Sequence, residues 1–379
     1  MRLLFALPGF HRYDRGAEIA LLAVAEELAA GGDEVTVIGS GGQRAGTAYT
    51  YRRVPSVRRE LFERFPRFPA FRNETAWEDA TFAARLFAQV DIASYDATVT
   101  CSFPHTHWAL RKRGRRGPAH FFVTQNGDWP ARSDDAEYSL FHCDGLVCTN
   151  PEYYEANKSR WNCALIPNGV DREIFTPGPS RRATFGIPES STVVLMVSAL
   201  IPSKRVLQAI QALQHMKDVF LVVAGDGPLR GEVQQLADLC LPGRFKRLTL
   251  RPEQMPELYR SADLFLHMSK NESFGNVYVE AMASGLPVVA HDSDTLRWIV
   301  GDGQYLCDTD SGSAVIDRIR AALADARVLN REHLKRFEWS VIAADYRTFI
   351  AQTLSTKAHT GPDRRKYSSD VVGPASDPH

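Results

Sequence analysis

The chain has 379 residues, of which 44% are hydrophobic and 24% are charged, a composition that excludes disorder over most of its length. Lys plus Arg and Asp plus Glu both number 45, so the formal net charge is zero, which disfavours a dedicated nucleic-acid-binding protein. The longest apolar run, Thr192 to Ile201, is too short to cross a bilayer. The length predicts two domains.

The N-terminal segment is predicted to be a strand. Its apolar run, Leu3–Leu7, is short, charged residues follow it closely, and no small-residue cleavage site is present, so a signal peptide is not expected. The six cysteines form no Cys-x-x-Cys pair. We therefore expect reduced thiols in a cytoplasmic protein.

Short apolar runs alternate with helical periodicity along the first half of the chain. A helix is predicted over Ala17–Ala30, between the first two strands. The predicted strands are Leu3–Leu7, Glu34–Ile38, Ala97–Cys101, His120–Thr124, Gly145–Cys148 and Ala164–Ile166. This βαβ rhythm is typical of a parallel sheet with helices on both faces.

Pro and Gly residues between Pro167 and Pro179 interrupt this rhythm and indicate a domain boundary. The alternation then restarts. The predicted strands are Val193–Val197, Phe220–Ala224, Arg247–Leu250, Leu264–Leu266 and Pro287–Ala290. The predicted helices are Lys204–His215, Leu229–Leu239, Met255–Arg260, Gly275–Ser284 and Ser311–Ala326.

The sequence thus predicts an α/β protein made of two doubly wound, Rossmann-like domains that face each other across a cleft. The domains are expected at residues 1–166 and 167–338. A final helix is predicted over Ser340–Leu354, and the polar segment 355–379 is predicted to be disordered.

The segment Lys270–Ala290 carries the strongest chemical signal. It begins after a predicted strand, passes through a turn that contains Gly275, and enters a helix. The backbone N–H groups of Gly275, Asn276 and Val277 open that helix and suit a phosphate group. Glu272 in the loop and Glu280 in the helix supply carboxylates that accept hydrogen bonds from hydroxyl groups. Together these features predict a sugar–diphosphate ligand. The fingerprint G-x-G-x-x-G is absent, which disfavours a nicotinamide-dependent oxidoreductase.

Glu272-x7-Glu280, with the Ala281–Ala290 stretch that follows, resembles the signature of retaining GT-B glycosyltransferases of family 4. The resemblance extends over roughly residues 1 to 355, and other stretches agree in order and spacing. These are Gly16–Glu18, Ile166–Asp171, Val223–Pro228, Leu258–Asp263 and Phe337–Ser340.

The resemblance implies roles for individual residues. Glu280 is expected to bind the ribose hydroxyls of a UDP- or GDP-linked sugar, Glu272 to contact the donor sugar, and Lys204 to bind the diphosphate. Gly16 corresponds to the glycine loop of the first domain. The resemblance also implies that the first domain takes the acceptor, that the last helix crosses back to that domain, and that no divalent metal is needed.

Two departures from the family pattern bear on chemistry. Ser198-Ala199 replaces the usual Gly-Arg, and Arg205 is expected to supply the second positive charge for the diphosphate. Asn126 matches the position where many members carry a His, and Asn cannot act as an acid or base. If attack occurs on the front face, the departing phosphate oxygen takes the acceptor's proton, and activity without that His remains open.

Two basic clusters lie in the predicted first domain. The segment Arg52–Arg72 contains seven arginines interleaved with four phenylalanines, and Arg111–Arg116 contains five cations. An Arg/Phe surface suits an anionic membrane or a lipid-linked acceptor at the inner membrane face. The alternative is a solvated loop whose phenylalanines pack inward. His105 and His107 could suggest a metal pair, but no acidic or Cys ligand is near them in the sequence, and no metal site is predicted.

The leading hypothesis is a retaining hexosyltransferase that moves a sugar from a nucleotide-sugar to an acceptor hydroxyl, in the synthesis of an envelope glycan, polysaccharide or glycolipid. The acceptor would be a sugar, a lipid-linked molecule or a small metabolite. Two alternatives remain open. One is a nucleotide-sugar 2-epimerase of the same fold, and the other is a non-catalytic protein that binds nucleotide-sugars.

Overall fold

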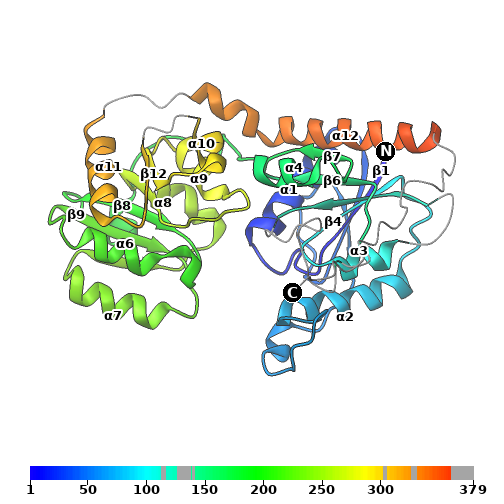
Figure 1. Cartoon of the computed structure of the whole chain (residues 1–379), viewed down its shortest axis with the longest axis horizontal. Helices are drawn as coiled ribbons and strands as arrows, with labels where there is room; N and C mark the ends of the chain where they lie inside the picture. Colours follow the sequence, from blue (N-terminus) through cyan, green and yellow to red (C-terminus); the bar gives the residue numbers. More distant parts are fainter. Residues whose placement is uncertain (112–116, 126–137, 139–140, 302–304, 326–330, 360–379) are drawn as a thin grey trace, which may run out of the picture.

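The computed structural model describes residues 1–111, 117–125, 138, 141–301, 305–325 and 331–359. Two α/β lobes lie side by side, and a long C-terminal helix runs along one edge of the N-terminal lobe (Figure 1). This arrangement confirms the prediction of two Rossmann-like domains. No helix in the described part of the chain combines the length and apolarity that a membrane span needs.

Within the described residues, the first domain contains a seven-stranded parallel sheet in the order β3-β2-β1-β4-β5-β6-β7. Apart from the edge strands β3 and β7, the strands are largely buried on both faces, which explains why most of them are nearly continuous apolar runs. Their bounds are β1 Arg2–Ala6, β2 Glu34–Gly39, β3 Thr50–Arg53, β4 Ala97–Cys101, β5 Ala119–Val123, β6 Gly145–Cys148 and β7 Cys163–Leu165. Its helices are α1 Gly16–Ala30, α2 Glu74–Gln89, α3 Pro104–Leu110 and α4 Pro151–Asn157, with the 3-10 turn η1 at Arg59–Phe62.

The second domain is built in the same way, on a six-stranded parallel sheet in the order β10-β9-β8-β11-β12-β13 among the described residues. Its strands are β8 Thr192–Val197, β9 Val219–Ala224, β10 Phe245–Leu248, β11 Leu264–His267, β12 Val288–His291 and β13 Leu306–Cys307. Its helices are α5 Arg182–Phe185, α6 Val206–Leu213, α7 Arg230–Cys240, α8 Met255–Arg260, α9 Asn276–Ala283, α10 Asp294–Val300 and α11 Gly312–Ala324, with 3-10 turns η3 Pro202–Lys204, η4 Pro252–Gln254 and η6 Arg331–Phe337.

The predicted strands all form, each within two residues of its expected bounds. Two strands were not predicted, β3 and β13. Both lie at a sheet edge, where β3 is short and largely polar and β13 has only two residues. Short, polar edge strands lack the apolar run on which the predictions depended.

The C-terminal helix α12 spans Trp339–His359 and crosses back to the first domain, as Figure 1 shows. Its buried residues Ile342, Tyr346 and Phe349 belong to the same hydrophobic core as Leu21 of α1. The predicted end at Leu354 is wrong, because the helix continues for five residues into the segment that was predicted to be disordered. The rest of that segment, 360–379, lies outside the described residues.

Candidate active site

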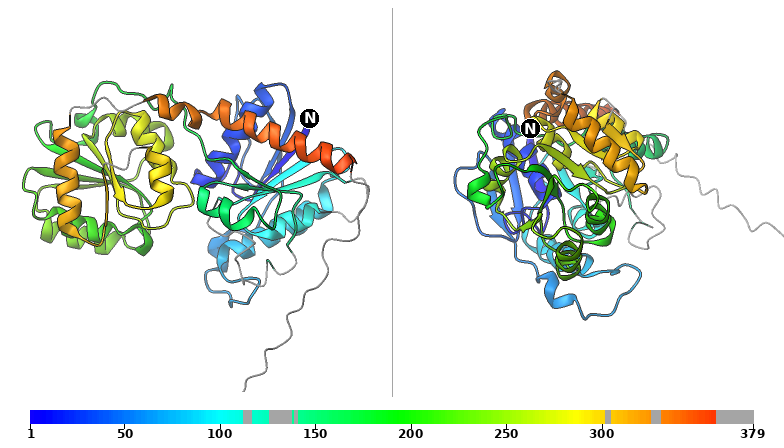
Figure 2. Two further views of the ribbon diagram at one scale, coloured as in Figure 1. Left: turned by 45° about the horizontal axis from the view of Figure 1, so that its top comes forward. Right: turned by 90° about the vertical axis from the view of Figure 1, so that its left-hand side faces the viewer.

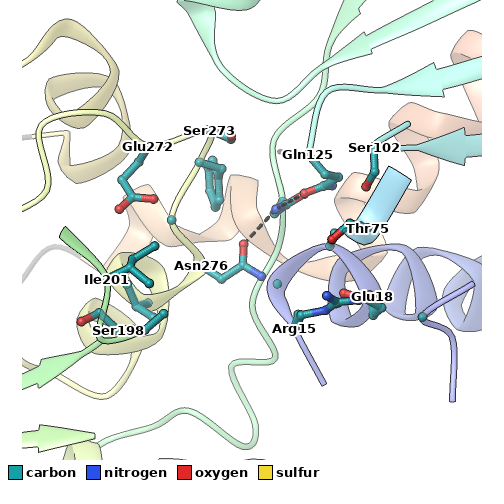
Figure 3. Close-up of a pocket in the computed structure, with 18 of the residues that line it drawn as sticks. Arg15, Glu18, Thr75, Ser102, Gln125, Ser198, Ile201, Glu272, Ser273 and Asn276 are labelled. Atoms are coloured by element: carbon teal, nitrogen blue, oxygen red, sulfur yellow. Dashed lines mark hydrogen bonds and ion pairs between the residues drawn. The ribbon is translucent and has the colours of Figure 1, made fainter. Parts of the chain in front are cut away.

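A cleft of about 610 Å³ lies between the two domains. Loops that follow strands of both sheets line it, which is where doubly wound sheets bind ligands. Gly9 follows β1, Ser102 follows β4 and Gln125 follows β5 on one wall, while Ser198 and Glu272 follow β8 and β11 on the other. Figure 3 shows Ser102 and Gln125 on one side of this space and Ser198 and Glu272 on the other.

The start of α9 forms part of the second-domain wall. Gly275 precedes the helix with φ +81°, and a Cβ there would lie 2.5 Å from the Tyr278 ring, so both conformation and space require glycine. The N–H groups of Asn276 and Val277 lie in the first turn of α9, where no preceding turn supplies acceptors. All three residues line the cleft, and their role in binding phosphate remains a prediction.

The start of α1 lies directly opposite. Gly16 is the first residue of α1, and Nδ2 of Asn276 lies 3.9 Å from the position that a Cβ on Gly16 would occupy. Arg15 precedes it and donates a 2.6 Å hydrogen bond to the buried Glu18 carboxylate. Two helix N-termini, one from each domain, therefore face the same space (Figure 3).

Lys204 and Glu272 form an ion pair on the second-domain wall, with Nζ 2.5 Å from Oε1. Both side chains are largely buried and both residues line the cleft. His267 lies 3.8 Å from the same carboxylate oxygen, and burial lowers the pKa of His267 to about 4. His267 is therefore neutral at pH 7, and the charge that faces Glu272 belongs to Lys204.

An amide network joins the domains at the cleft. Gln125 Nε2 donates to Asn168 Oδ1 at 2.7 Å, and Asn168 Nδ2 donates to Gln125 Oε1 at 3.0 Å and to Asn276 Oδ1 at 2.8 Å (Figure 3). Asn126, predicted at the family's His position, lies outside the described residues, although its neighbour Gln125 lines the cleft.

Glu280 lies one turn further along α9 and is not among the residues that line this cleft. Its carboxylate accepts a 2.8 Å hydrogen bond from the hydroxyl of Tyr259, which is buried. Burial raises the pKa of Glu280 to about 7, against the opposing effect of that hydrogen bond. The carboxyl group is thus close to half-ionised at neutral pH.

Arg205 lies next to Lys204 but points to a different set of partners. Its guanidinium donates to Asp310 Oδ1 at 2.6 Å and to Thr309 Oγ1 at 2.9 Å, and the residue does not line the cleft. Among the described residues that line the cleft, the arginine found beside Lys204 is Arg15, which belongs to the first domain.

Polar residues of α2 and of the loop after β4 complete the first-domain wall. Glu78 is buried and accepts a 2.9 Å hydrogen bond from Arg12, while its Oε2 has no hydrogen-bond partner among the described residues. Asp79 is buried beside it, and burial raises the pKa of Asp79 to about 7. Ser102 lines the same wall with φ +72°, an uncommon conformation for a residue other than glycine.

Sequence reasoning missed Arg15, Glu18, Gln125, Asn168 and the pair on α2. Gln125 could have been found, because it directly follows a predicted strand, and Arg15 because it precedes the predicted glycine loop. The pair on α2 gave no signal, since nothing in the spacing distinguishes it from a solvated helix face.

The histidines considered as site residues are used elsewhere. His105 Nε2 donates a 3.2 Å hydrogen bond to the Ala70 carbonyl, and the buried His107 has its Nδ1 2.9 Å from Oγ1 of Thr100. Among the residues that the structure describes, no group of three or more His, Cys, Asp or Glu side chains is placed to hold a metal ion.

Glycosyltransferase Family 4 matches residues 15–174, and Glycosyl transferases group 1 matches residues 179–338. A D-inositol 3-phosphate glycosyltransferase of Mycolicibacterium smegmatis is 34% identical over 204 residues, which cover 48% of this chain and 46% of that protein. The lipopolysaccharide core biosynthesis glycosyltransferase LpsE of Rhizobium meliloti is 29% identical over 201 residues, covering 51% and 56%. The chain matches about half the length of these curated relatives.

Solved structures share the fold over nearly the whole chain. Sucrose-phosphate synthase from Thermosynechococcus elongatus matches with a TM-score of 0.73 and 20% identity, covering 94% of this chain and 99% of that one. Anabaena Alr3699/HepE, solved in complex with UDP and glucose, matches with a TM-score of 0.69 and 20% identity, covering 93% and 99%. With the two families spanning both domains and the GT-B arrangement present, the chain belongs to the group 1 glycosyltransferases of family 4, whose members are retaining enzymes.

Proposed function

We propose that the protein is a retaining glycosyltransferase that transfers a hexose from a nucleotide-sugar to an acceptor hydroxyl. The observation that carries this proposal is the Lys204–Glu272 ion pair, which lies in the cleft together with the start of α9. A cation and free backbone N–H groups suit a diphosphate, and a carboxylate suits sugar hydroxyls. Glu280, further along the same helix, is our candidate for the ribose hydroxyls.

The donor proposed as the first probe is UDP-glucose. HepE, a neighbour in fold, was solved in complex with UDP and glucose. This choice fits a cleft that offers Lys204 from the second domain and Arg15 from the first. GDP-linked sugars are the alternative to be tested beside it.

In the proposed reaction, the bond between the sugar C1 and the diphosphate oxygen breaks as the acceptor oxygen bonds to C1 on the same face. The acceptor's proton passes to the departing phosphate oxygen, so no protein base is required. Negative charge grows on the diphosphate, and Lys204 with the N–H groups of Asn276 and Val277 stabilises it. Glu272 positions the sugar through its hydroxyls.

The acceptor is proposed to lie against the first-domain wall formed by Thr75, Glu78, Asp79 and Ser102. The Glu78 Oε2 atom lacks a hydrogen-bond partner in the described structure, and a hydroxyl group is the donor that would satisfy it. Relatives named for inositol phosphate glycosylation and for lipopolysaccharide core synthesis favour a polyhydroxyl acceptor, in glycolipid or envelope glycan synthesis.

The test is product analysis with a panel of UDP- and GDP-sugars and polyol acceptors, using mass spectrometry and NMR of the anomeric proton. We expect a glycosylated acceptor with the donor's anomeric configuration, and loss of product in Lys204→Ala. Lys217→Ala, which changes an exposed lysine of the same domain, is the matched control. A rearranged free sugar with no glycoside would indicate an epimerase. Donor binding without any turnover would indicate a binding protein.

A further inference from the structure

A compact projection extends from the first domain beside the N-terminal end of α2, at residues 58–72. Figures 1 and 2 show it standing away from the body of the domain, on the side opposite α12. It consists of η1 and a tight turn closed by a bridge between Phe68 and Phe71. We call it the Arg/Phe projection.

Aromatic packing on one anchor holds the projection together. The rings of its four phenylalanines lie around Trp77 of α2, with centroids 4.2 to 6.4 Å from the Trp77 ring. Phe62 is buried in this cluster and stacks on Trp77 at 5.6 Å. The projection is therefore a packed structure and not a loose loop.

Three apolar side chains nevertheless remain at its surface. Leu61 is 67% exposed, Phe65 is 49% exposed and Phe68 is 50% exposed. The alternative that the phenylalanines only pack inward thus fails for two of them, since Phe65 and Phe68 contact Trp77 and still present half their surface. Large apolar groups gathered at one exposed tip mark an interaction site.

Arginines surround this apolar tip. Arg58, Arg64 and Arg67 are exposed, and within the described part of the chain none of the three has an ion-pair partner. Between Arg52 and Arg72 seven arginines face two glutamates, which gives 7 − 2 = +5 in a chain whose net charge is zero. A tip that combines exposed Phe and Leu with an excess of Arg matches an anionic lipid surface in both charge and polarity.

The projection is connected to the active-site cleft. The guanidinium carbon of Arg59, in the projection, lies 5.2 Å from the centroid of the Tyr13 ring. The guanidinium carbon of Arg15 lies 4.3 Å from the same centroid. Arg15 lines the cleft on the proposed acceptor side. A membrane that met the tip would therefore lie near the wall against which the acceptor is proposed to bind.

We propose that the Arg/Phe projection docks the protein on an anionic membrane, with Leu61, Phe65 and Phe68 inserted at the interface and Arg64 and Arg67 against the headgroups. That the docked protein acts on an acceptor in the membrane rests on the proposed function, but the docking of the projection does not. The arginine stems cover apolar surface while their guanidinium groups stay among the phosphates.

The test is co-sedimentation of the full chain with vesicles of phosphatidylcholine alone and with added phosphatidylserine, at low and high salt. We expect binding to the anionic vesicles at low salt and its loss at high salt. Each arginine near an anionic surface raises the membrane partition coefficient about fivefold. Arg64→Gln/Arg67→Gln should thus lower the partition coefficient roughly 25-fold. Arg318→Gln/Arg320→Gln, the same charge change on exposed positions of α11, should leave it unchanged.

A second pair of variants tests insertion separately from charge. Phe65→Ser/Phe68→Ser should weaken binding to the anionic vesicles at low salt although it leaves every charge in place, whereas Val341→Ser, at an exposed position on α12, should have no effect. Circular dichroism and UDP-glucose binding of each variant show whether the fold and the donor site are intact.

Two outcomes would overturn the proposal. One is a protein that stays in the supernatant with anionic vesicles at low salt. The other is binding that heparin competes for and that the Phe65→Ser/Phe68→Ser variant retains in full, which would indicate a soluble polyanion as the partner. Vesicle binding without sugar transfer would leave the docking intact and contradict the proposed function, so the two failures are distinguishable.

Discussion

At the residue scale, we predict that affinity for the donor depends on pH through the ionisation of Glu280. Because ribose hydroxyls donate to a carboxylate, the donor should bind the deprotonated form, whose formation is opposed by a pKa raised to about 7. Affinity for UDP-glucose should therefore rise with pH, by up to about tenfold per unit below pH 7, and level off above it. Calorimetry between pH 5.5 and 8.5 measures this.

The variant Glu280→Gln is the control, since it keeps an acceptor but cannot titrate in this range. Its affinity should be weaker at pH 8 and independent of pH. A wild-type affinity that stays constant from pH 5.5 to 8.5 would remove Glu280 from the proposed donor site.

Lys204 makes a second prediction at this scale. Lys204 is paired with Glu272 at 2.5 Å before any donor binds. When a donor binds, the attraction between Lys204 and the diphosphate is therefore partly offset by loss of the ion pair with Glu272. Charge that grows on the diphosphate during reaction gives the larger gain. Lys204→Ala should thus lower kcat on the order of 100-fold and affect donor affinity less. Steady-state kinetics beside calorimetry would show it, and an equal loss in both would contradict a transition-state role.

At the element scale, α12 is part of the first domain's core although it ends the described chain. Ile350 is fully buried in the cluster that includes Leu21 and Phe121. Ile350→Ala should lower the free energy of unfolding by about 2–5 kcal/mol, from lost burial and the cavity left behind. Val341→Ala, on the exposed side of α12, should change it by less than about 0.5 kcal/mol. Urea denaturation measures both, and similar values would mean that α12 docks only loosely.

A second element, α2, is joined to the start of α3 by a buried carboxylate. Asp79 accepts a 3.2 Å hydrogen bond from the Thr106 amide, and burial raises its pKa from 3.8 to about 7. The folded state then binds a proton between pH 4 and 7 that the unfolded state has released, so stability is lost as pH rises through that window.

The variant Asp79→Asn isolates this effect from other titrating groups. Relative to the variant, the wild type should lose stability steadily from pH 4 to pH 7 and remain constant above it. Urea denaturation of both proteins across this range gives the difference. A difference that does not change with pH would show that Asp79 has an ordinary pKa in the folded protein.

At the scale of the whole molecule, the cleft has walls from both domains, and one ligand should therefore affect both. UDP-glucose should slow amide hydrogen exchange at the start of α9, near Asn276, and at the start of α1, near Gly16, because the two helix starts face each other. Exchange in α7 of the second domain, which does not line the cleft, should not change. Protection confined to α9 would restrict the donor site to one domain.

The sequence alone determined the architecture, because βαβ alternation and continuous apolar strands are local patterns that suit one kind of sheet. It also indicated Glu272, Gly275, Asn276 and Val277 as candidate ligand-binding residues, because loops that follow parallel strands lie at the ligand-binding edge of such a sheet, whereas Gly16 was implied by the family resemblance. Lys204 and Glu272 are 68 positions apart in the sequence, and only the folded structure shows that they form an ion pair.

Tertiary structure decided which charges share the cleft. Arg205 is next to Lys204 in sequence, yet its left-handed backbone, with φ +55°, and its bonds to Asp310 and Thr309 direct it elsewhere. Arg15 enters the cleft instead, from the other domain. Side-chain direction and the approach of two separately folded domains depend on packing between distant parts of the chain. The local sequence does not encode that packing, which is why the direction of the Arg205 side chain could not be predicted, whereas the place of Arg15 directly before the predicted glycine loop was a usable signal.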